Sequence, residues 1–285
     1  MDLLLRPATR ADAAECGRIC FEAFDRIARE HGFRGDFPSV EAATELVESL
    51  LDHPGFYSVV AERDGRVVGS NFLDERSPVV GVGPVTVDPD RQNRGVGRRL
   101  MEDVVHRAAD RHAPGIRLLQ SSYHCRSFAL YAGMGFEFRE TLACLQGPPI
   151  GVGIAGRGVR TATDADLAAC NDLCRRVHGV DRGGEVVDAL KQGTARVVEH
   201  DGHLTGYATD LAFFAHAVGQ TTDDVKALIG AAPAFAGPGI LVPASDSALL
   251  LWCLLNGLQI TQLMTLMSIG LFNKPAGAYL PSILY

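Results

Sequence analysis

The sequence predicts two related α/β domains in one chain. Its 285 residues, 47% of them hydrophobic, suffice for one large core or two smaller ones. Residues 6–20 read RPATRADAAECGRIC and residues 160–174 read RTATDADLAACNDLC, so an Arg, an Ala-Thr, an Ala-Asp and a Cys pair recur at one offset. A second echo aligns VVAERDGRVVGS with VVEHDGHLTGY. Repetition at this length indicates two copies of one domain and not a solenoid of short units.

The boundary between the copies lies in a segment rich in Gly and Pro. Residues 147–158 hold five Gly and two Pro, a composition that sustains neither a helix nor a central strand. We therefore expect a first domain at residues 1–146, a linker at 147–158 and a second domain at 159–285.

Each copy is expected to begin with a short strand, at residues 3–6 and 159–160. An amphipathic helix follows, with Thr9 or Thr163 as its N-cap. The Cys pairs are four residues apart, on one face of these helices. We interpret them as small core residues, because a zinc site needs ligand pairs in turns with further partners nearby, and we expect no metal.

Strands and a second helix continue the first copy. Residues 56–62 and 66–72 flank the turn signal Asp64-Gly65 and predict a hairpin. Residues 79–87 predict a third strand, which Gly81, Gly83 and Pro84 interrupt. Such residues indicate a bulge or the close approach of a ligand or another segment. The apolar spacing from about Gly97 onward then predicts a helix.

Charge and composition exclude several classes of protein. The chain has 27 Lys and Arg against 34 Asp and Glu, a net charge of −7, which argues against a nucleic-acid or anionic-membrane coat. The seven Cys and the absence of a secretory pattern at the start indicate a reducing cytoplasm. Residues 247–273 carry no charge, yet their internal Asn, Gln and Gly weaken a membrane-span interpretation.

The loop before the second helix has the features of an anion site. It follows a strand and opens a helix, where the first backbone N–H groups lack internal partners and the macrodipole is positive. Gly95 and Gly97 allow close approach of the backbone, and arginines supply fixed charge. These are Arg91, Arg94, Arg98 and Arg99. The spacing matches neither the P-loop nor the dinucleotide fingerprint.

Several motifs in their order resemble the GNAT superfamily of N-acetyltransferases. Residues 92–97, QNRGVG, are similar to its Gln/Arg-x-x-Gly-x-Gly/Ala motif and follow a Val-Asp-Pro at 87–89. Residues 130–136, LYAGMGF, are similar to its Leu-Tyr-x-x-x-Gly-Phe segment. The resemblance covers residues 3 to about 145. It implies an α/β fold in which each domain has a central mixed, mostly antiparallel sheet flanked by helices.

The resemblance also implies acetyl-CoA as co-substrate. Its pyrophosphate would lie on the N–H groups of the loop, and its pantetheine arm would lie along the third strand. The expected binding residues are Val85, Thr86, Val87, Gln92, Asn93, Arg94, Gly95, Val96, Gly97, Arg98 and Tyr131.

The same resemblance suggests candidate catalytic groups. Tyr131 would protonate the departing thiolate, and a backbone N–H near Val87 would bind the developing oxyanion. The strand carboxylate that many relatives use as a base is absent, because Gly81, Gly83 and Pro84 occupy its strand. Substitutes are His124, which could equally cap the following helix, and the carboxylates Asp74, Glu75 and Glu22.

The second copy lacks the Gly-containing loop. The corresponding region carries Asp223 and Asp224 at an expected helix start, where two carboxylates repel a phosphate. Residues 251–258, LWCLLNGL, echo residues 130–136 with one extra residue. They predict a helix, a Gly turn and a strand in place of a membrane span, with Trp252 in place of Tyr131. We expect a degenerate GNAT copy that packs on the first, completes the acceptor pocket or mediates homodimer contacts.

The sequence thus favours a cytoplasmic N-acetyltransferase that moves an acetyl group from acetyl-CoA to the primary amine of a small molecule, with no nucleic acid or membrane as partner. The alternative is a non-catalytic module that binds or senses acyl-CoA, or a scaffold. The acceptor loops are expected at residues 33–39 and 73–77, which carry no transferable signature.

Overall fold

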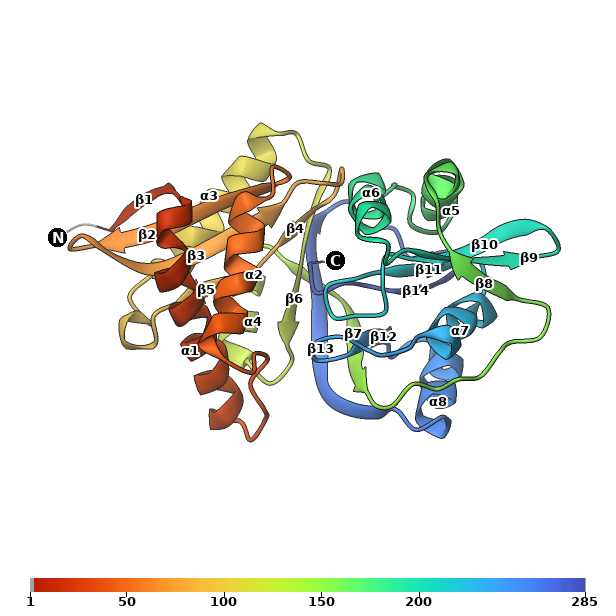
Figure 1. Ribbon diagram of the computed structural model, residues 1–285. Coiled ribbons are helices and arrows are strands. Elements are labelled where there is room, and N and C mark those ends of the chain that lie inside the picture. Colours follow the sequence, from red (N-terminus) through yellow and green to blue (C-terminus); the bar gives the residue numbers. More distant parts are fainter. Residues whose placement is uncertain (1–2, 285) are drawn as a thin grey trace.

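The computed structural model describes residues 3–284 as a nine-stranded sheet and a five-stranded sheet with helices packed on their faces (Figure 1). The N-terminal half contains the following strands and helices: β1 (Leu4–Pro7), α1 (Ala13–Glu30), α2 (Val40–Asp52), β2 (Phe56–Arg63), β3 (Arg66–Asp74), β4 (Val80–Val82), β5 (Thr86–Val87), α3 (Val96–Asp110), β6 (Gly115–Ser121), α4 (Cys125–Ala132) and β7 (Glu137–Gln146).

The C-terminal half repeats much of this order. Its strands and helices are β8 (Gly158–Thr161), α5 (Leu167–His178), α6 (Gly183–Gln192), β9 (Arg196–His200), β10 (His203–Ala208), β11 (Ala217–Gly219), α7 (Thr222–Ala231), β12 (Ile240–Pro243), α8 (Ser247–Leu255), β13 (Gln259–Gly270) and β14 (Ala278–Leu280). The predicted hairpin of β2 and β3, the strand interrupted between β4 and β5, and the helix α3 are all present.

The sequence repeat corresponds to a repeated structural device. Arg6 donates two hydrogen bonds to Asp12, at 2.8 and 2.9 Å, and Asp12 completes a capping box with Thr9. In the second copy Arg160 donates two hydrogen bonds of 2.8 Å to Asp166, which completes the same box with Thr163. The conserved spacing of Arg, Thr and Asp in the two copies therefore fixes the same entry into the first helix.

Helices cover both faces of the sheet in the N-terminal half. Val60 and Phe72 pack against α1 and α2, whereas the neighbouring residues Val59 and Leu73 point to the opposite face and pack with α3. This alternation follows from the two-residue period of a strand. The two cysteine pairs of the repeat lie in the apolar layers of the two halves, Cys16 and Cys20 on the buried face of α1 and Cys170 and Cys174 on that of α5.

Two long strands are exchanged between the halves. The strand order of the large sheet is β1-β2-β3-β4-β6-β13-β7-β12, so β13 lies between β6 and β7. β7 in turn lies between β13 and β12 of the C-terminal half. Leu142 pairs with Met264, 122 residues later, the same separation as between Gly135 and Gly257 before the two strands. Equivalent positions therefore face each other across a local two-fold axis.

The exchange bears on the expected division of the chain. Residues 147–157 form no helix or strand and Gly158 begins β8, but the backbone pairing of β7 with β12 and β13 crosses the segment expected as a linker. The segment is also packed, because Ile150 and Ile154 contact the core of the C-terminal half and Arg157 forms an ion pair with Asp224 at 2.9 Å. Neither half has a complete sheet without the other.

The apolar run at 247–273 folds as the echo predicts. It forms α8, a turn at Gly257 with φ +93°, and β13. Gly135 makes the corresponding turn in the first copy with φ +92°. Within residues 3–284, none of the helices combines the length and the apolar character that crossing a bilayer requires.

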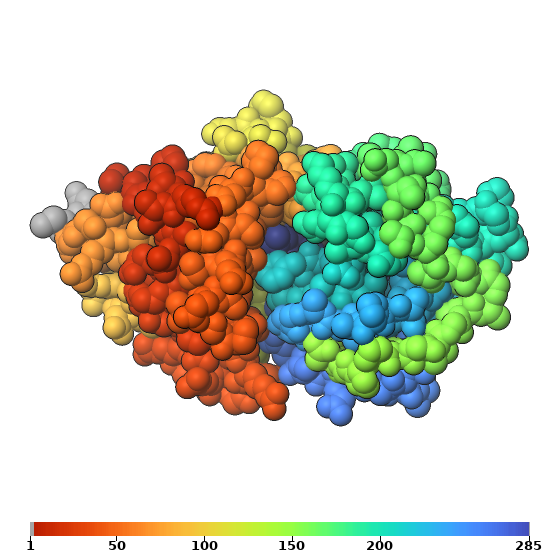
Figure 2. All heavy atoms as spheres, viewed as in Figure 1, coloured from red at the N-terminus to blue at the C-terminus, as the bar shows by residue number. Residues whose placement is uncertain are grey.

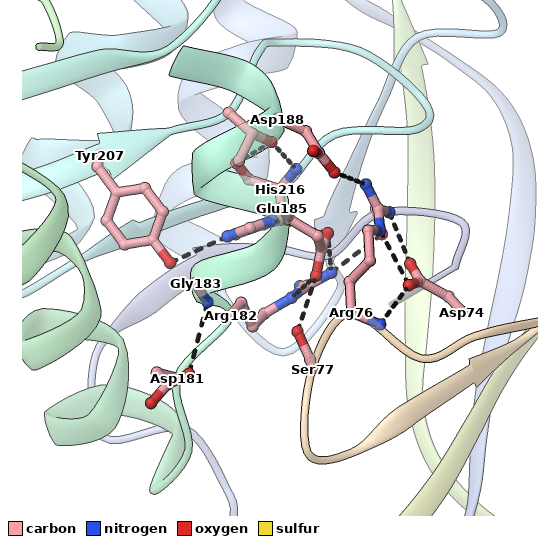
Figure 3. Close-up of polar contacts among 12 residues, drawn as sticks. Asp74, Arg76, Ser77, Asp181, Arg182, Gly183, Glu185, Asp188, Tyr207 and His216 are labelled. Atoms are coloured by element: carbon pink, nitrogen blue, oxygen red, sulfur yellow. Dashed lines mark hydrogen bonds and ion pairs between the residues drawn. The ribbon is translucent and has the colours of Figure 1, made fainter. Parts of the chain in front are cut away.

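Ion pairs join the two halves beside α6 (Figure 3). Arg76 donates to both oxygens of Asp74, at 2.9 and 2.6 Å, and to Asp188 of α6, at 3.0 Å. Ser77 donates to Glu185 at 3.5 Å. The loop after β3, which the sequence analysis assigned to the acceptor site, is therefore bound to the other half of the molecule.

The same cluster continues into the C-terminal half through buried side chains. Glu185 pairs with Arg182 at 2.6 Å and with the ring of His216 at 3.2 Å, and the other ring nitrogen of His216 lies 2.9 Å from the hydroxyl of Tyr207. Burial and the nearby Arg182 lower the pKa of His216 to about 4. The imidazole is thus neutral near pH 7, and it bridges α6 to β10.

Candidate functional site

A cavity of about 420 Å³ lies between the N-terminal half and loops of the C-terminal half. Its walls come from α1 and the loop after it, from residues 82–87, from the loop before α3, from the end of β6 and from α4. The C-terminal half contributes Phe213, Phe214, Pro238, Met264, Ile283 and Leu284. In Figure 2 the C-terminal residues, in dark blue, are visible between the two halves.

The loop before α3 presents the start of that helix to the cavity. Gly95, the N-cap, has a φ of +80°, a conformation that glycine adopts without strain. No side chain caps the helix, and its first turn holds no acidic residue. Gly95, Val96, Gly97 and Arg98 all line the cavity. The helix start therefore combines unpaired N–H groups, the positive end of the dipole and an arginine.

Arg126 of α4 is hydrogen-bonded to the same loop. It donates to Gln92 at 2.6 Å and to Asn93 at 3.2 Å, while the Gln92 amide donates to the backbone oxygen of Val87 at 3.2 Å. Asn93 has a φ of +62°, which its side-chain amide type tolerates. Gln92, Asn93 and Arg126 line the cavity, whereas Arg94 is exposed and lies outside it.

The interrupted strand opens a gap in the sheet beside this loop. β4 pairs with β6 as far as Val82 and Leu118, and β6 then continues to Ser121 beside β13. β5 pairs with β3, so residues 83–87 lie across the cavity from the end of β6. Val85, Thr86 and Val87 line this gap, where the sequence analysis expected an extended ligand.

Gly81 shows why the strand lacks a carboxylate. A Cβ atom at this position would lie 1.9 Å from the backbone oxygen of Leu284. Residues near the end of the chain pass directly over β4 and occupy the space of a side chain there. The residue pattern at 81–84 thus reflects the close approach of another segment, one of the two interpretations that the sequence allowed.

Tyr131 lies in α4 and lines the cavity with its side chain almost fully buried. Burial raises the pKa of its hydroxyl to about 12, while Ser127 acts in the opposite direction. Its ring packs edge-on against Phe136 at a centroid distance of 6.1 Å. The phenol is therefore protonated at neutral pH and available as a hydrogen-bond donor inside an apolar site.

His124 is the residue before α4, and its ring contacts the hydroxyl of Ser127 at 2.8 Å. The ring makes no side-chain hydrogen bond to the helix N–H groups. Burial, with Arg126 as a further cause, lowers the pKa of His124 to about 4. His124 and Ser127 line the cavity together with Tyr131, so the cavity wall formed by α4 includes a neutral imidazole.

The candidate carboxylates from the sequence lie elsewhere. Glu75 accepts from Arg107 at 2.8 Å and pairs with Arg111 at 3.3 Å, and it does not line the cavity. Asp74 pairs with Arg76 and Glu22 pairs with Arg18, both outside the cavity. The structure therefore brings together Tyr131, His124 and the loop, but not these acids. The arginines that bind Glu75 come from a distant segment, whereas those that bind Asp74 and Glu22 are nearby residues outside any recognised motif.

Sequence reasoning missed the carboxylate that does line the cavity, Asp36, and the aromatic residues of the C-terminal half. Asp36 falls within residues 33–39, the expected acceptor loop, but no pattern distinguished it from the other acids. Phe213 and Phe214 reach the site because β7 and β13 are exchanged, and no local signal predicts that contact.

The sequence is similar to known acetyltransferases. Residues 21–136 match the Acetyltransferase (GNAT) family. A mycothiol acetyltransferase of Kytococcus sedentarius is 31% identical over 127 residues, which cover 44% of this chain and 43% of that protein. A mycothiol acetyltransferase of Thermobifida fusca is 32% identical over 125 residues, 41% of this chain and 39% of that protein. The chain matches about two fifths of the length of these curated relatives.

Solved structures resemble the chain over nearly its whole length. A structure from Pyrococcus horikoshii covers 97% of this chain with 94% of its own, at a TM-score of 0.73 and 16% identity. A tandem GNAT protein from the clavulanic acid biosynthesis pathway covers 94% with 98%, at a TM-score of 0.57 and 16% identity. At such identities the likeness concerns the fold, and it confirms the predicted α/β class with two GNAT-like units.

Proposed function

Because residues 21–136 match the Acetyltransferase (GNAT) family, we propose that the protein transfers an acetyl group from acetyl-CoA to the primary amine of a small molecule. The observation that carries this proposal is the meeting of three features in one cavity. These are an uncapped helix start with Gly and Arg, a gap between diverging strands, and a buried protonated Tyr131.

The loop fits the phosphates of the donor. Gly95 and Gly97 leave the start of α3 uncovered, and Arg98 and Arg126 add charge at the same place. In the proposal the backbone of residues 92–98 holds the pyrophosphate, and residues 85–87 lie along the pantetheine arm. Arg94, which lies outside the cavity, would act only on the exposed part of the donor.

The chemistry requires a neutral amine, a stabilised oxyanion and a proton for the thiolate. Bound acetyl-CoA supplies an activated acyl group. The phenol of Tyr131 keeps its proton at neutral pH and can donate to a thiolate, the conjugate base of a stronger acid. Backbone N–H groups near Val87 are the proposed oxyanion donors.

His124 takes a positioning role in this proposal. A group whose pKa is lowered to about 4 remains neutral during the reaction and is a weak proton acceptor at pH 7. His124 contacts Ser127, and Ser127 interacts with Tyr131, so in this proposal His124 helps to orient the Tyr131 hydroxyl. Glu75 has no role in the proposed reaction, since Arg107 and Arg111 bind it away from the cavity.

The named activity of the curated relatives is consistent with a small amine as acceptor. Both relatives are called mycothiol acetyltransferases, and the match covers about two fifths of each. The C-terminal half of the present chain forms part of the cavity wall, so we infer that it selects the acceptor. Its proposed role is to complete the site, without a second donor site of its own.

Release of free thiol from acetyl-CoA, followed with a panel of small amines, tests the proposal. The expected result is amine-dependent release together with saturable binding of CoA to the full chain. The alternative, an acyl-CoA-sensing or scaffold module, predicts tight CoA binding with no thiol release for any amine. Absence of CoA binding would contradict both.

A further inference from the structure

The cavity contains a negative charge as well as the positive charge of its loop. Asp36, between α1 and α2, is the one carboxylate among the cavity-lining residues of the described chain. Arg98 and Arg126 lie at the Gly-containing loop, whereas Asp36 lies beside β13. The cavity is therefore positive where the donor phosphates would bind and negative at a separate place.

Asp36 has little compensation for its burial within the protein. Gln262 of β13 donates to its Oδ1 at 3.3 Å, and the Gln262 amide oxygen accepts from Ser121 at 3.4 Å. Across residues 3–284, no Lys, Arg or His forms an ion pair with Asp36, and burial raises the pKa of its carboxyl group. A carboxylate held in such surroundings gains from a cationic partner. The structure therefore favours a ligand that carries one.

Much of the cavity lining near Asp36 is apolar, with Ser121 at the end of β6 as a polar neighbour. Phe24 and Phe37 pack edge-on at 5.9 Å on one wall, and Phe213 and Phe214 pack edge-on at 5.8 Å on another. Met264 of β13 completes the lining beside Gln262. These side chains offer no partners to hydroxyl groups or to additional charges, but they gain free energy by contact with hydrocarbon.

From these observations we propose that Asp36 binds the ammonium group of the acceptor, and that the acceptor is a primary amine with one positive charge and an apolar alkyl or aryl body. The inference rests on the proposed function, because it names the acceptor of that transfer. A polyamine or an amino sugar would set charges or hydroxyl groups against the aromatic walls without compensation.

The test measures amine binding directly. Phenethylamine is titrated into the full chain in the presence of CoA by calorimetry. Asp36→Asn is expected to weaken phenethylamine binding on the order of 100-fold, while the affinity for CoA is unchanged. Asp36→Glu is expected to restore part of the binding. The matched control is Asp25→Asn, since Asp25 pairs with Arg29 near the same loop and does not line the cavity.

A second measurement uses the unaltered protein, so that its result does not depend on whether the variants fold. Phenethyl alcohol, the neutral analogue, is expected to bind on the order of 100-fold more weakly than phenethylamine. Equal binding of the alcohol and the amine would overturn the proposal. Binding of phenethylamine to Asp36→Asn at the original affinity would overturn it as well.

Turnover measurements separate this proposal from the proposed function. Phenethylamine is expected to give a higher kcat/KM than spermidine or glucosamine, and Asp36→Asn is expected to raise KM more than it lowers kcat. Asp36-dependent binding of the amine without any thiol release would contradict the acetyltransferase proposal and support the present one. Thiol release that favours spermidine or glucosamine would support the acetyltransferase proposal and contradict the proposed acceptor.

Discussion

The first turns of α3 and α7 are the same element of the repeat, yet they differ in what covers them. α3 begins after Gly95, with no side-chain cap and no acid in its first turn. α7 begins after Thr221, which forms a capping box with Asp224. Both helices have a positive N-terminus, but in α7 the Asp224 carboxylate lies there and accepts from the backbone N–H and the hydroxyl of Thr221, at 2.9 and 2.7 Å.

Buried contacts complete the change in the second copy. Asp224 is almost fully buried and accepts from Thr205 at 2.8 Å as well as from Arg157 of the linker. The third residue of the helix is Arg98 in α3, where it lines the cavity, and Asp224 in α7, where it forms a buried ion pair with Arg157. The start of α3 is open to the cavity, whereas the start of α7 is joined to the linker through Asp224 and Arg157.

The largest effect is expected when the open helix start is blocked. A Cβ at Gly97 would lie 3.6 Å from Val87 and 3.9 Å from Leu130, so the ring of Gly97→Trp must extend into the cavity. We expect the Kd for CoA to rise more than about 100-fold, or about 3 kcal/mol. Asp223→Trp, at the same position of α7, should leave the Kd unchanged. Equal effects of the two variants would remove the functional difference between the helix starts.

The next effect concerns stability. Asp224→Ala removes the capping box and leaves Arg157 without its carboxylate, and we expect the free energy of unfolding to fall by about 3 to 5 kcal/mol. Arg98→Ala, at the same helix position in α3, should change it by less than about 0.5 kcal/mol and weaken CoA binding instead. Chemical denaturation followed by circular dichroism measures both. A stable Asp224→Ala protein would show that the joint is dispensable.

A smaller effect is expected at the helix that ends in the Gly turn of each copy. Tyr131→Phe removes the proposed proton donor, and kcat should fall on the order of 100-fold with the affinity for CoA retained. Trp252→Phe, at the echoing position in α8, should leave kcat within about twofold, because α8 contributes no residue to the cavity. Unaltered thiol release by Tyr131→Phe would assign proton transfer to another group.

The smallest effect is expected at the Arg–Asp ion pair before the first helix, which the two copies share. Arg6→Ala and Arg160→Ala each remove the same bidentate ion pair, and each should lower the free energy of unfolding by about 1 kcal/mol. The Arg6 hydrogen bond lowers the pKa of Asp12 to about 2, below the value near 3.9 of an unfolded chain. This stabilisation is complete above about pH 4 and is lost as the pH falls toward 2.

Denaturation of the unaltered protein and of Arg6→Ala, at pH 7 and pH 3, measures this contribution. The difference between the two proteins should be smaller at pH 3, since Asp12 is then protonated in the unfolded state. A difference that grows toward pH 3, or a loss confined to one of the two arginine variants, would contradict the equivalence of the two helix entries.

Local elements were predictable because local chemistry determines them. The Asp-Gly turns between β2 and β3 and between β9 and β10 have positive φ at both residues in both copies, as their sequences predict. The capping residues and the Gly turns before β7 and β13 follow in the same way. The loop at 92–98 was also recognisable, since its Gly and Arg residues act through the backbone of one short segment.

Contacts between distant segments decided the rest of the site. Glu75 was a candidate base in the sequence, but Arg107 and Arg111 bind it from a helix that packs beside β3. No sequence pattern distinguished Asp36, and in the structure it lines the cavity beside Gln262 of β13. Neither outcome has a local signature.

The repeat, the order of strands and helices and the helix entries follow from the sequence alone, because each depends on residues within one turn or one hairpin of each other. Only the tertiary structure decided the exchange of β7 and β13, the passage of Leu284 over Gly81, and the aromatic wall that the C-terminal half adds to the cavity. The sequence of an apolar strand does not specify which strand it pairs with, so the pairing follows from the packing of the whole chain.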